Sequence, residues 1–340
     1  MKKSSIFFII ILLLGYFLAP LFVNNAFSFK LSEIFILVLF ASSFQFIART
    51  AGMFSLGHAA FYGVGAYASA VLVQKGYSIF FVLLMAGVIA FLLSMIIGYL
   101  SLRSTGIYFA MLTLSLAQVV YLVIYRTPAL GGQDGIPGIL AQPINLFGWE
   151  LDISRPEKYY YVIFFTVVVS IFILYILTNS SLGHFLRSIR ENSVRTSSLG
   201  INVKRYQILA FGIAGFFGGV SGALLSPLEG IITPETLSWT QSALPLIIVL
   251  IGGINSFWGP IVGAITFEML YSLTIDSGAS NIYLGIILLA IVLLFPDGVI
   301  GVGRRFISML RTSFSKKKGR NMEELKGVGK HGNSAARRSI

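Results

Sequence analysis

The stretch NSSLGHFLRSIRENSVRTSSLGINVKR, residues 179–205, is the longest polar interval of the chain that has a membrane-length apolar run on each side. Its apolar residues recur at the i, i+3, i+4 and i+7 spacing of one helix face, at Leu182, Phe185, Leu186 and Ile189. The polar face carries His184, Arg187, Arg190 and Glu191. The pattern predicts an amphipathic helix, with N-cap oxygens from residues 179–181 and a C-terminal stop at Gly200. Such a helix offers a surface to a partner; the alternative is an ordinary loop whose basic residues only set the chain's orientation.

The composition predicts an integral membrane protein. The 340 residues are 56% hydrophobic and 11% charged, whereas soluble proteins average about 25% charged residues. The chain has no cysteine, which excludes disulfides and thiolate metal sites, and its three histidines lack the spacing of a metal site. The net charge of +12 lies at the ends of apolar runs and in the C-terminal tail, which favours a membrane surface over nucleic acid as its partner.

Apolar runs of spanning length predict an all-α, polytopic membrane helix bundle. The runs cover about 5–23, 31–48, 51–73, 78–102, 106–125, 159–178, 206–229, 237–273 and 282–295. We interpret the first as a span, although a signal peptide is the alternative. The sequence GGINSFWGP at 252–260 interrupts the run at 237–273, and two short crossings there give about ten in total. Eight spans with a re-entrant hairpin would satisfy the same charge rule.

Glycine and alanine are abundant in the runs at 51–73 and 206–229. In lipid, small residues allow helix backbones to approach closely. The two runs contain similar sequences at 61–66 and 217–223, and we attribute this likeness to shared small-residue packing. We also expect glycine to loosen these spans, so that the bundle rocks between two packings.

The distribution of basic residues orients the chain. Placing the N-terminus, Arg49, Arg103, residues 179–205 and the tail in the cytoplasm leaves only five of the 25 Lys and Arg residues outside. Both termini are then cytoplasmic, and the loop at 126–158 faces outward. We expect a transmembrane domain over 1–300 and a basic, largely disordered cytoplasmic tail over 301–340.

A few polar residues lie within the predicted spans: Gln45, Arg49, His58, Gln118 and Glu268. Polar groups at these depths indicate a transport pathway, but helix–helix hydrogen bonds and snorkelling explain them equally well. The lack of regularly spaced intramembrane charges disfavours an ion-coupled carrier. No P-loop, GxSxG motif or catalytic triad is present, so we expect neither ATP hydrolysis nor another enzymatic activity.

Five stretches together resemble a known family. They are FSLGHAAFYGVGAYASAVL (54–72), GIYFAMLTLSLAQVV (106–120), LGGQDGIPGI (130–139), LRSIRENSVRTSSLGINVKRYQILAFGIAGFFGGVSGALL (186–225) and VLIGGINSFWGPIVGA (249–264). In this order, over roughly residues 31–300, they are similar to the permease subunits of branched-chain amino-acid ABC importers, the LivH/LivM type, and most of all to its M-type members.

The resemblance implies a type-II-like ABC importer permease in a bacterial or archaeal plasma membrane, with no cofactor of its own. Its implied partners are a homologous permease subunit, two cytoplasmic ABC ATPase subunits and an extracytoplasmic solute-binding protein, all around a lipid bilayer. Because the family includes urea and amide systems, these substrates are an alternative to branched-chain amino acids. A stand-alone channel or secondary carrier is the alternative from another class, and the scattered polar residues disfavour an intramembrane enzyme.

The resemblance also implies three groups of site residues. The stretch 179–205 becomes the ATPase-coupling loop, and its matching residues are Arg187, Arg190, Glu191, Asn192 and Gly200. The outer-face motif comprises Gly131, Gly132, Asp134 and Gly135. Candidates for the pathway or for helix packing are His58, Gln118, Gly252, Gly253 and Glu268. One departure is that relatives usually carry an Ala/Glu-rich run before the glycine, where this chain has Arg195, Thr196, Ser197 and Ser198.

Overall fold

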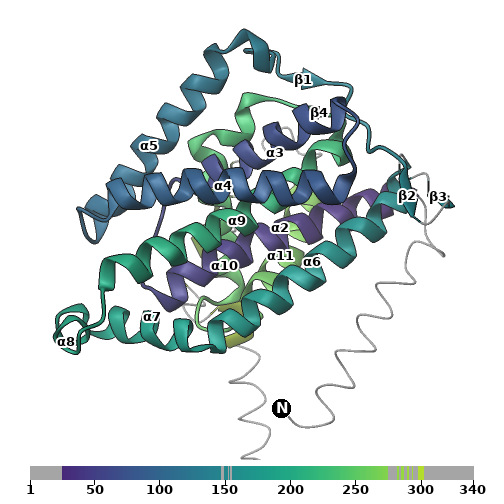
Figure 1. The fold of residues 1–340 in the computed structure, drawn as a ribbon. Coiled ribbons are helices and arrows are strands. Elements are labelled where there is room, and N and C mark those ends of the chain that lie inside the picture. Colours follow the sequence, from purple (N-terminus) through teal and green to yellow (C-terminus); the bar gives the residue numbers. More distant parts are fainter. Residues whose placement is uncertain are drawn as a thin grey trace, which may run out of the picture.

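The described residues form a helical bundle with two short β-ribbons (Figure 1). The computed structural model describes residues 25–146, 149–151, 153 and 155–274, and positions 282, 285, 286, 289, 290, 293 and 298–301. The predicted first run at 5–23 and the tail beyond residue 301 lie outside this part of the chain. The long helices are α2 (Asn25–Thr50), α3 (His58–Gln74), α4 (Ile79–Ser101), α5 (Ile107–Arg126), α6 (Pro156–Asn179) and α9 (Val203–Glu229).

Shorter elements connect these helices. They are η1 (Pro128–Leu130), β1 (Ile136–Pro137), β2 (Ile144–Leu146), β3 (Trp149–Leu151), α7 (Ser181–Glu191), α8 (Ser193–Ser198), β4 (Ile231–Ile232), η2 (Pro234–Leu237), α10 (Trp239–Gly252) and α11 (Gly259–Thr274). Strands β1 and β4 pair antiparallel, as do β2 and β3. Within the described part, α2, α4, α5, α6 and α9 are long and apolar enough to cross a membrane.

Helix α9 lies at the centre of the bundle and packs against α2, α3 and α4. The most apolar 18-residue stretches of α2 and α9 are each 78% buried, against 22% in α5. Helix α5 accordingly stands at the edge of the bundle (Figure 1).

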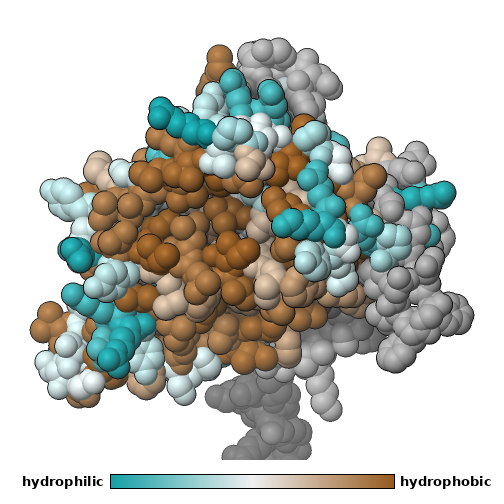
Figure 2. Space-filling model, turned by 45° about the horizontal axis from the view of Figure 1, so that its top comes forward, coloured by the Kyte–Doolittle hydropathy of each residue, from teal (hydrophilic) through white to brown (hydrophobic). Residues whose placement is uncertain are grey.

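Apolar side chains form a broad outer surface bounded by polar residues (Figure 2). Helix α4, for example, exposes Phe80, Leu84, Leu92 and Ile96. An apolar belt between polar rims is what a bilayer requires.

Helices α3 and α9 meet backbone to backbone. A Cβ atom added to Gly222 would lie 1.8 Å from the carbonyl oxygen of Tyr62, and one added to Gly65 would lie 2.1 Å from that of Gly219. The similar sequences at 61–66 and 217–223 therefore pack on each other, in agreement with the small-residue explanation of their likeness. Glycine does not loosen this contact as we expected. It removes the side chains that would separate the backbones, and so tightens the contact.

Helix α3 begins seven residues later than the predicted run at 51–73. Residues 51–57 are not helical. Gly52 has a φ of +69°, and a Cβ atom at Gly57 would lie 2.3 Å from the carbonyl oxygen of Thr113 on α5. Side chains replace the missing helical bonds, since Leu56 N donates to Thr113 Oγ1 and Gly57 N donates to Ser55 Oγ. Irregular backbone is tolerated inside a membrane protein only where such partners are present.

The run at 237–273 divides into α10 and α11 at the predicted interruption. The helices form a close hairpin, because a Cβ atom at Gly252 would lie 1.8 Å from Gly259 O and one at Gly263 would lie 2.0 Å from Ile248 O. At 1.5 Å per residue, each helix is about 20–25 Å long, which is shorter than a hydrocarbon core of about 30 Å. The choice between two short crossings and a re-entrant hairpin stays a prediction.

Candidate functional site

The stretch 179–205 folds as two short helices at one end of the bundle. Helix α7 lies across that end, and α8 lies at its tip (Figure 1). The predicted amphipathic face is present, since Leu186 and Ile189 are buried while Arg190 and Glu191 are exposed. The N-cap oxygens are not used as expected. Ser180 Oγ, at the N-cap position, donates to the carbonyl of Leu177 instead, so the preceding helix occupies it.

Two arginines fasten α7 to the ends of the membrane helices. Arg187 Nη2 donates to Thr178 O of α6 at 3.2 Å, and Arg190 Nη1 donates to Arg49 O of α2. The stem of Arg190 also covers Gly52, where an added Cβ atom would lie 2.7 Å from its Cγ. These arginines therefore satisfy carbonyls at the C-terminal ends of α2 and α6, where cations are favoured.

Asn192 divides the polar stretch, which we expected to be one helix. Its backbone is extended, with φ −158° and ψ 97°, and its Oδ1 accepts from Arg195 N, so it caps α8. After α8, Gly200 has a φ of +83°, which confirms the predicted stop. Asn202 caps α9 in the same way, through Arg205 N. Asn is a favoured N-cap residue, and sequence reasoning overlooked this signal at Asn192 and Asn202. In each case the side chain accepts from the backbone N–H three residues later.

The tip of this segment exposes apolar side chains. Val194 on α8 is 75% exposed and Leu199, directly after α8, is 76% exposed. Arg190, Glu191 and Arg195 are exposed beside them. The segment thus combines a rigid attachment to the bundle with an apolar, charge-edged tip. We call residues 181–200 the docking segment.

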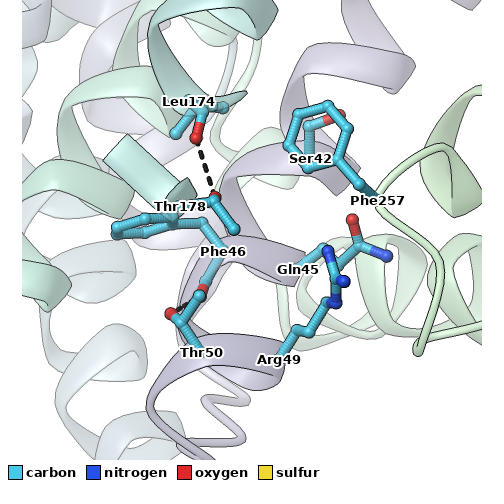
Figure 3. A pocket seen from close by; sticks show the side chains of 8 residues that line it. All are labelled: Ser42, Gln45, Phe46, Arg49, Thr50, Leu174, Thr178 and Phe257. Carbon is cyan, nitrogen blue, oxygen red and sulfur yellow. Dashed lines mark hydrogen bonds between the residues drawn. The ribbon is translucent and has the colours of Figure 1, made fainter. Parts of the chain in front are cut away.

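The C-terminal end of α2 is a junction of three parts of the chain. The docking segment reaches it through Arg190, and residues 51–57 leave from it. Gln45 Nε2 donates to Ser256 O at 2.7 Å and to Ile254 O at 3.2 Å, so it holds the turn between α10 and α11. Beside Gln45 is a small hollow that also reaches α6 and Phe257 (Figure 3).

His58 lies in the interior of the bundle and is fully buried. Its Nε2 is 2.8 Å from Ser43 Oγ, and its ring packs against those of Phe40, Phe44 and Phe61. Within the described residues its Nδ1 has no hydrogen-bond partner. The next residue, Ala59, donates its N–H to Ser242 Oγ of α10. These contacts position the start of α3 against α2 and α10.

The other pathway candidates lie on three different elements. Gly252 and Gly253 are at the turn after α10, where Gly253 has a φ of +105°. Glu268 on α11 is close enough to Lys30 and Glu33 of α2 to interact with them electrostatically. Gln118 is partly exposed on α5. The structure does not assemble these residues into one site. It also contains no cluster of His, Asp and Glu suited to a metal ion among the residues that it describes.

The predicted outer-face motif is a glycine turn that joins the ends of α5, α9 and α3. Gly131, Gly132 and Gly135 all have positive φ, and a Cβ atom at Gly135 would lie 2.0 Å from Ile232 O. Asp134 is exposed at the turn. The following strand β1 pairs with β4, and Gln74 Nε2 at the end of α3 donates to Pro137 O at 2.9 Å. Helices α3 and α9 therefore end on the same side of the bundle and run in the same direction.

Sequence comparison finds relatives of this chain among known proteins. The chain is 28% identical over 291 residues to the high-affinity branched-chain amino acid transport system permease protein LivM of Escherichia coli, which covers 79% of this chain and 68% of that protein. It is 25% identical over 197 residues to the probable branched-chain amino acid transport permease protein LivM of Methanocaldococcus jannaschii, over 55% of this chain and 54% of the relative.

A shorter similarity extends to a permease with another named substrate. The nucleoside ABC transporter permease protein NupC of Lactococcus lactis is 30% identical over 116 residues, covering 34% of this chain and 36% of the relative. No solved structure matches the chain significantly. The family described as branched-chain amino acid transport system / permease component matches residues 27–296, so the chain is a multi-pass membrane protein that belongs to this ABC transporter permease family.

Proposed function

We propose that this chain is a translocation subunit of an ABC importer for branched-chain amino acids. It pairs with a homologous permease subunit, and two cytoplasmic ATPase subunits supply the free energy of transport. The names of the LivM relatives support this substrate class. A shorter stretch is similar to a nucleoside permease, so the solute is to be identified by transport measurements.

The observation that carries the proposal is the docking segment. Val194 and Leu199 are three-quarters exposed beside the exposed Arg190, Glu191 and Arg195, and in the proposed topology this end of the molecule lies outside the lipid. Exposed apolar residues with charged neighbours are typical of a protein–protein contact. The occupant that we propose is the ATPase subunit, with Arg190, Glu191 and Arg195 at the rim of the contact.

The basic residues favour a cytoplasmic position for the docking segment. Arg49 and the α4–α5 connection with Arg103 would lie on the same side, together with both chain termini. The glycine turn at 131–135 would then face outward, where a solute-binding protein approaches. We retain the predicted division into a transmembrane domain over 1–300 and a basic cytoplasmic tail over 301–340, and the predicted type-II-like arrangement in the plasma membrane.

The mechanism follows from the rigid attachment of α7. Closure of the ATPase pair on ATP would displace the docking segment as one unit. Because Arg187 and Arg190 tie α7 to the ends of α6 and α2, the displacement reaches these two helices directly. Helix α2 also holds the α10–α11 turn through Gln45, so three parts of the bundle move together. A packed bundle responds to such a displacement by changing between discrete arrangements.

Co-purification tests the docking segment. The whole complex is extracted from its native host with a tag on this chain, which carries either Val194→Ser with Leu199→Ser or the control Ser197→Ala on the same short helix. We expect the double variant to lose most of the ATPase subunits and to retain the second permease, whereas the control retains both. Retention of the ATPase subunits at the wild-type ratio by the double variant would show that another surface makes the contact.

Transport measurements test the activity and the substrate. Vesicles that contain the complex, the binding protein and internal ATP should accumulate leucine, isoleucine or valine, and vesicles without ATP should not. Accumulation of urea in place of these amino acids would move the proposal to the amide branch of the family. Uptake that needs no ATP would instead support a channel or carrier.

A further inference from the structure

Helix α5 presents most of its surface outward and touches the rest of the bundle with one narrow face. Its buried residues are Phe109, Ala110, Thr113, Ala117 and Ile124. These positions lie within one face of a helix with 3.6 residues per turn. The remaining surface must therefore meet lipid, another subunit or water.

The outward surface of α5 has two different stripes. One follows the i, i+4, i+7 and i+11 spacing through Met111, Ser115, Gln118 and Leu122, opposite the buried face. The other runs beside it through Leu112, Val119 and Val123, and through Leu116, which also packs against the core; all four residues are aliphatic, and Val119 and Val123 are more than half exposed. The aliphatic stripe suits lipid. The first, which we call the Gln118 stripe, carries polar groups.

Gln118 is costly to place against lipid. It is the twelfth residue of the 20-residue helix, so it lies about 17 Å along the helix axis, near the middle of the span. Within the described part of the chain no hydrogen bond involves its amide, whereas Ser115 Oγ donates to Met111 O in its own helix. An amide without a partner in an apolar medium costs about 1–3 kcal/mol or more. Polar residues in membrane spans accordingly face a bundle interior or a water-filled cavity.

We propose that the Gln118 stripe lines the water-filled path through which the solute crosses the membrane, and that the Gln118 amide hydrogen-bonds the passing solute at mid-depth. This inference rests on the proposed function, because the second wall of the path is the homologous permease subunit. An amide suits a zwitterionic amino acid, since it donates to a carboxylate and accepts from an ammonium group. It carries no charge that would hold the solute too tightly to leave.

The position of a residue around the axis of α5 separates this proposal from two alternatives, a dry protein contact and a lipid-facing surface. A dry contact with the second permease would bury the Gln118 stripe in protein. If the stripe faced lipid, Gln118 would have the same apolar surroundings as Val119. Only a path brings water to Gln118 and Ser115 while Val119, one residue away, stays in lipid.

The natural absence of cysteine in this chain makes the test direct. Gln118→Cys, Ser115→Cys and the control Val119→Cys are each placed in the tagged chain of the whole complex in membrane vesicles. A small, charged methanethiosulfonate is applied without nucleotide and again with ATP and vanadate, and the labelling of the purified chain is measured. Because the thiolate is the reactive form and an apolar environment suppresses it, we expect labelling at residues 118 and 115 to be roughly tenfold or more faster than at 119 in one nucleotide state.

Equal and slow labelling at all three positions in both nucleotide states would overturn the proposal. Fast labelling at 119 with slow labelling at 118 would do the same. Labelling does not need transport, so a complex that carries no branched-chain amino acid but is labelled at 118 and 115 would refute the proposed substrate and leave the path in place.

A second variant separates contact with the solute from packing. We expect Gln118→Leu to assemble with all partners and to raise the KM for the solute or abolish uptake, whereas Val119→Leu transports as the wild type does. Unchanged uptake by Gln118→Leu would exclude a role of its amide in transport.

Discussion

Gly218 and Gly222 lie one turn apart on α9, yet their surroundings predict opposite effects of adding a methyl group. At Gly222 the new Cβ would lie 1.8 Å from Tyr62 O, a backbone atom of α3 that cannot move without the helix. At Gly218 the nearest atom is His58 Nε2 at 3.4 Å, which is ordinary contact. The pair therefore measures the backbone contact between α3 and α9 with the same substitution in the same helix.

The magnitudes follow from two opposing terms. Replacing glycine by alanine inside a helix stabilises the protein by about 0.5–1 kcal/mol through the unfolded chain and helix propensity. Overpacking costs about 1–3 kcal/mol, and a clash with backbone belongs at the upper end. We expect Gly218→Ala to be neutral or slightly stabilising and Gly222→Ala to be destabilising, with a difference of about 2–3 kcal/mol between them.

The assay is the thermal loss of the monodisperse elution peak in detergent, for both variants and the wild type under the same conditions. A lower midpoint for Gly222→Ala and an equal or higher one for Gly218→Ala is the expected order. Equal midpoints would show that α3 and α9 do not touch at Tyr62 and Gly222, and the close-packed centre of the bundle would have to be abandoned.

Three further predictions concern the junctions around this centre. Asn192→Ala should destabilise α8 by about 1 kcal/mol because it loses its N-cap, and limited proteolysis should then cleave faster at 192–200. Asn192→Asp, which can still cap, should retain the wild-type cleavage pattern. Equal cleavage rates for the two variants would show that Asn192 does not stabilise α8 as a cap. Gln45→Leu removes the side-chain donor to Ile254 O and one of two donors to Ser256 O, which also accepts from Gly259 N, at a cost of about 0.5–1.5 kcal/mol for each lost bond; its thermal midpoint should fall below that of Gln118→Leu, and the reverse order would contradict both assignments. Gly135→Ala should destabilise the outer turn more than Gly138→Ala, because both glycines have positive φ but a Cβ at Gly138 meets nothing within 4 Å; similar thermal midpoints would mean that β1 does not lie against β4.

Sequence reasoning worked best where a single element decides its own structure. The bounds of α4, α5, α6 and α9 fall within a few residues of the predicted runs, because length and hydropathy alone define a spanning helix. The amphipathic face of α7 was likewise predictable from Leu186 and Ile189. The interruption at 252–260 was found because several glycines and a proline lie close together there.

Sequence reasoning missed features that depend on two distant segments. The loss of helix at 51–57 depends on Thr113, which accepts from Leu56 across the bundle and replaces a helical bond. The function of Gln45 depends on carbonyls more than 200 positions away. No local pattern contains these partners. The expectation that glycine loosens the spans failed for the same reason, since the effect of a glycine depends on what approaches it.

In the proposed mechanism, the C-terminal end of α2 connects the docking segment to the bundle without a long chain of contacts. Arg190 binds the carbonyl of Arg49 in the last turn of α2, and Gln45 binds the α10–α11 turn one turn earlier. The same end leads into residues 51–57, where the N–H of Leu56 donates to Thr113 Oγ1 on α5. In that mechanism a movement of α7 would reach the α10–α11 turn through Gln45, and α5 through residues 51–57 and Thr113. Among the five candidate spans in the described part of the chain, helix α5 is the least buried, and it carries Gln118. The close backbone contact between α3 and α9 would then be the fixed part of the bundle, against which the junction at the end of α2 moves.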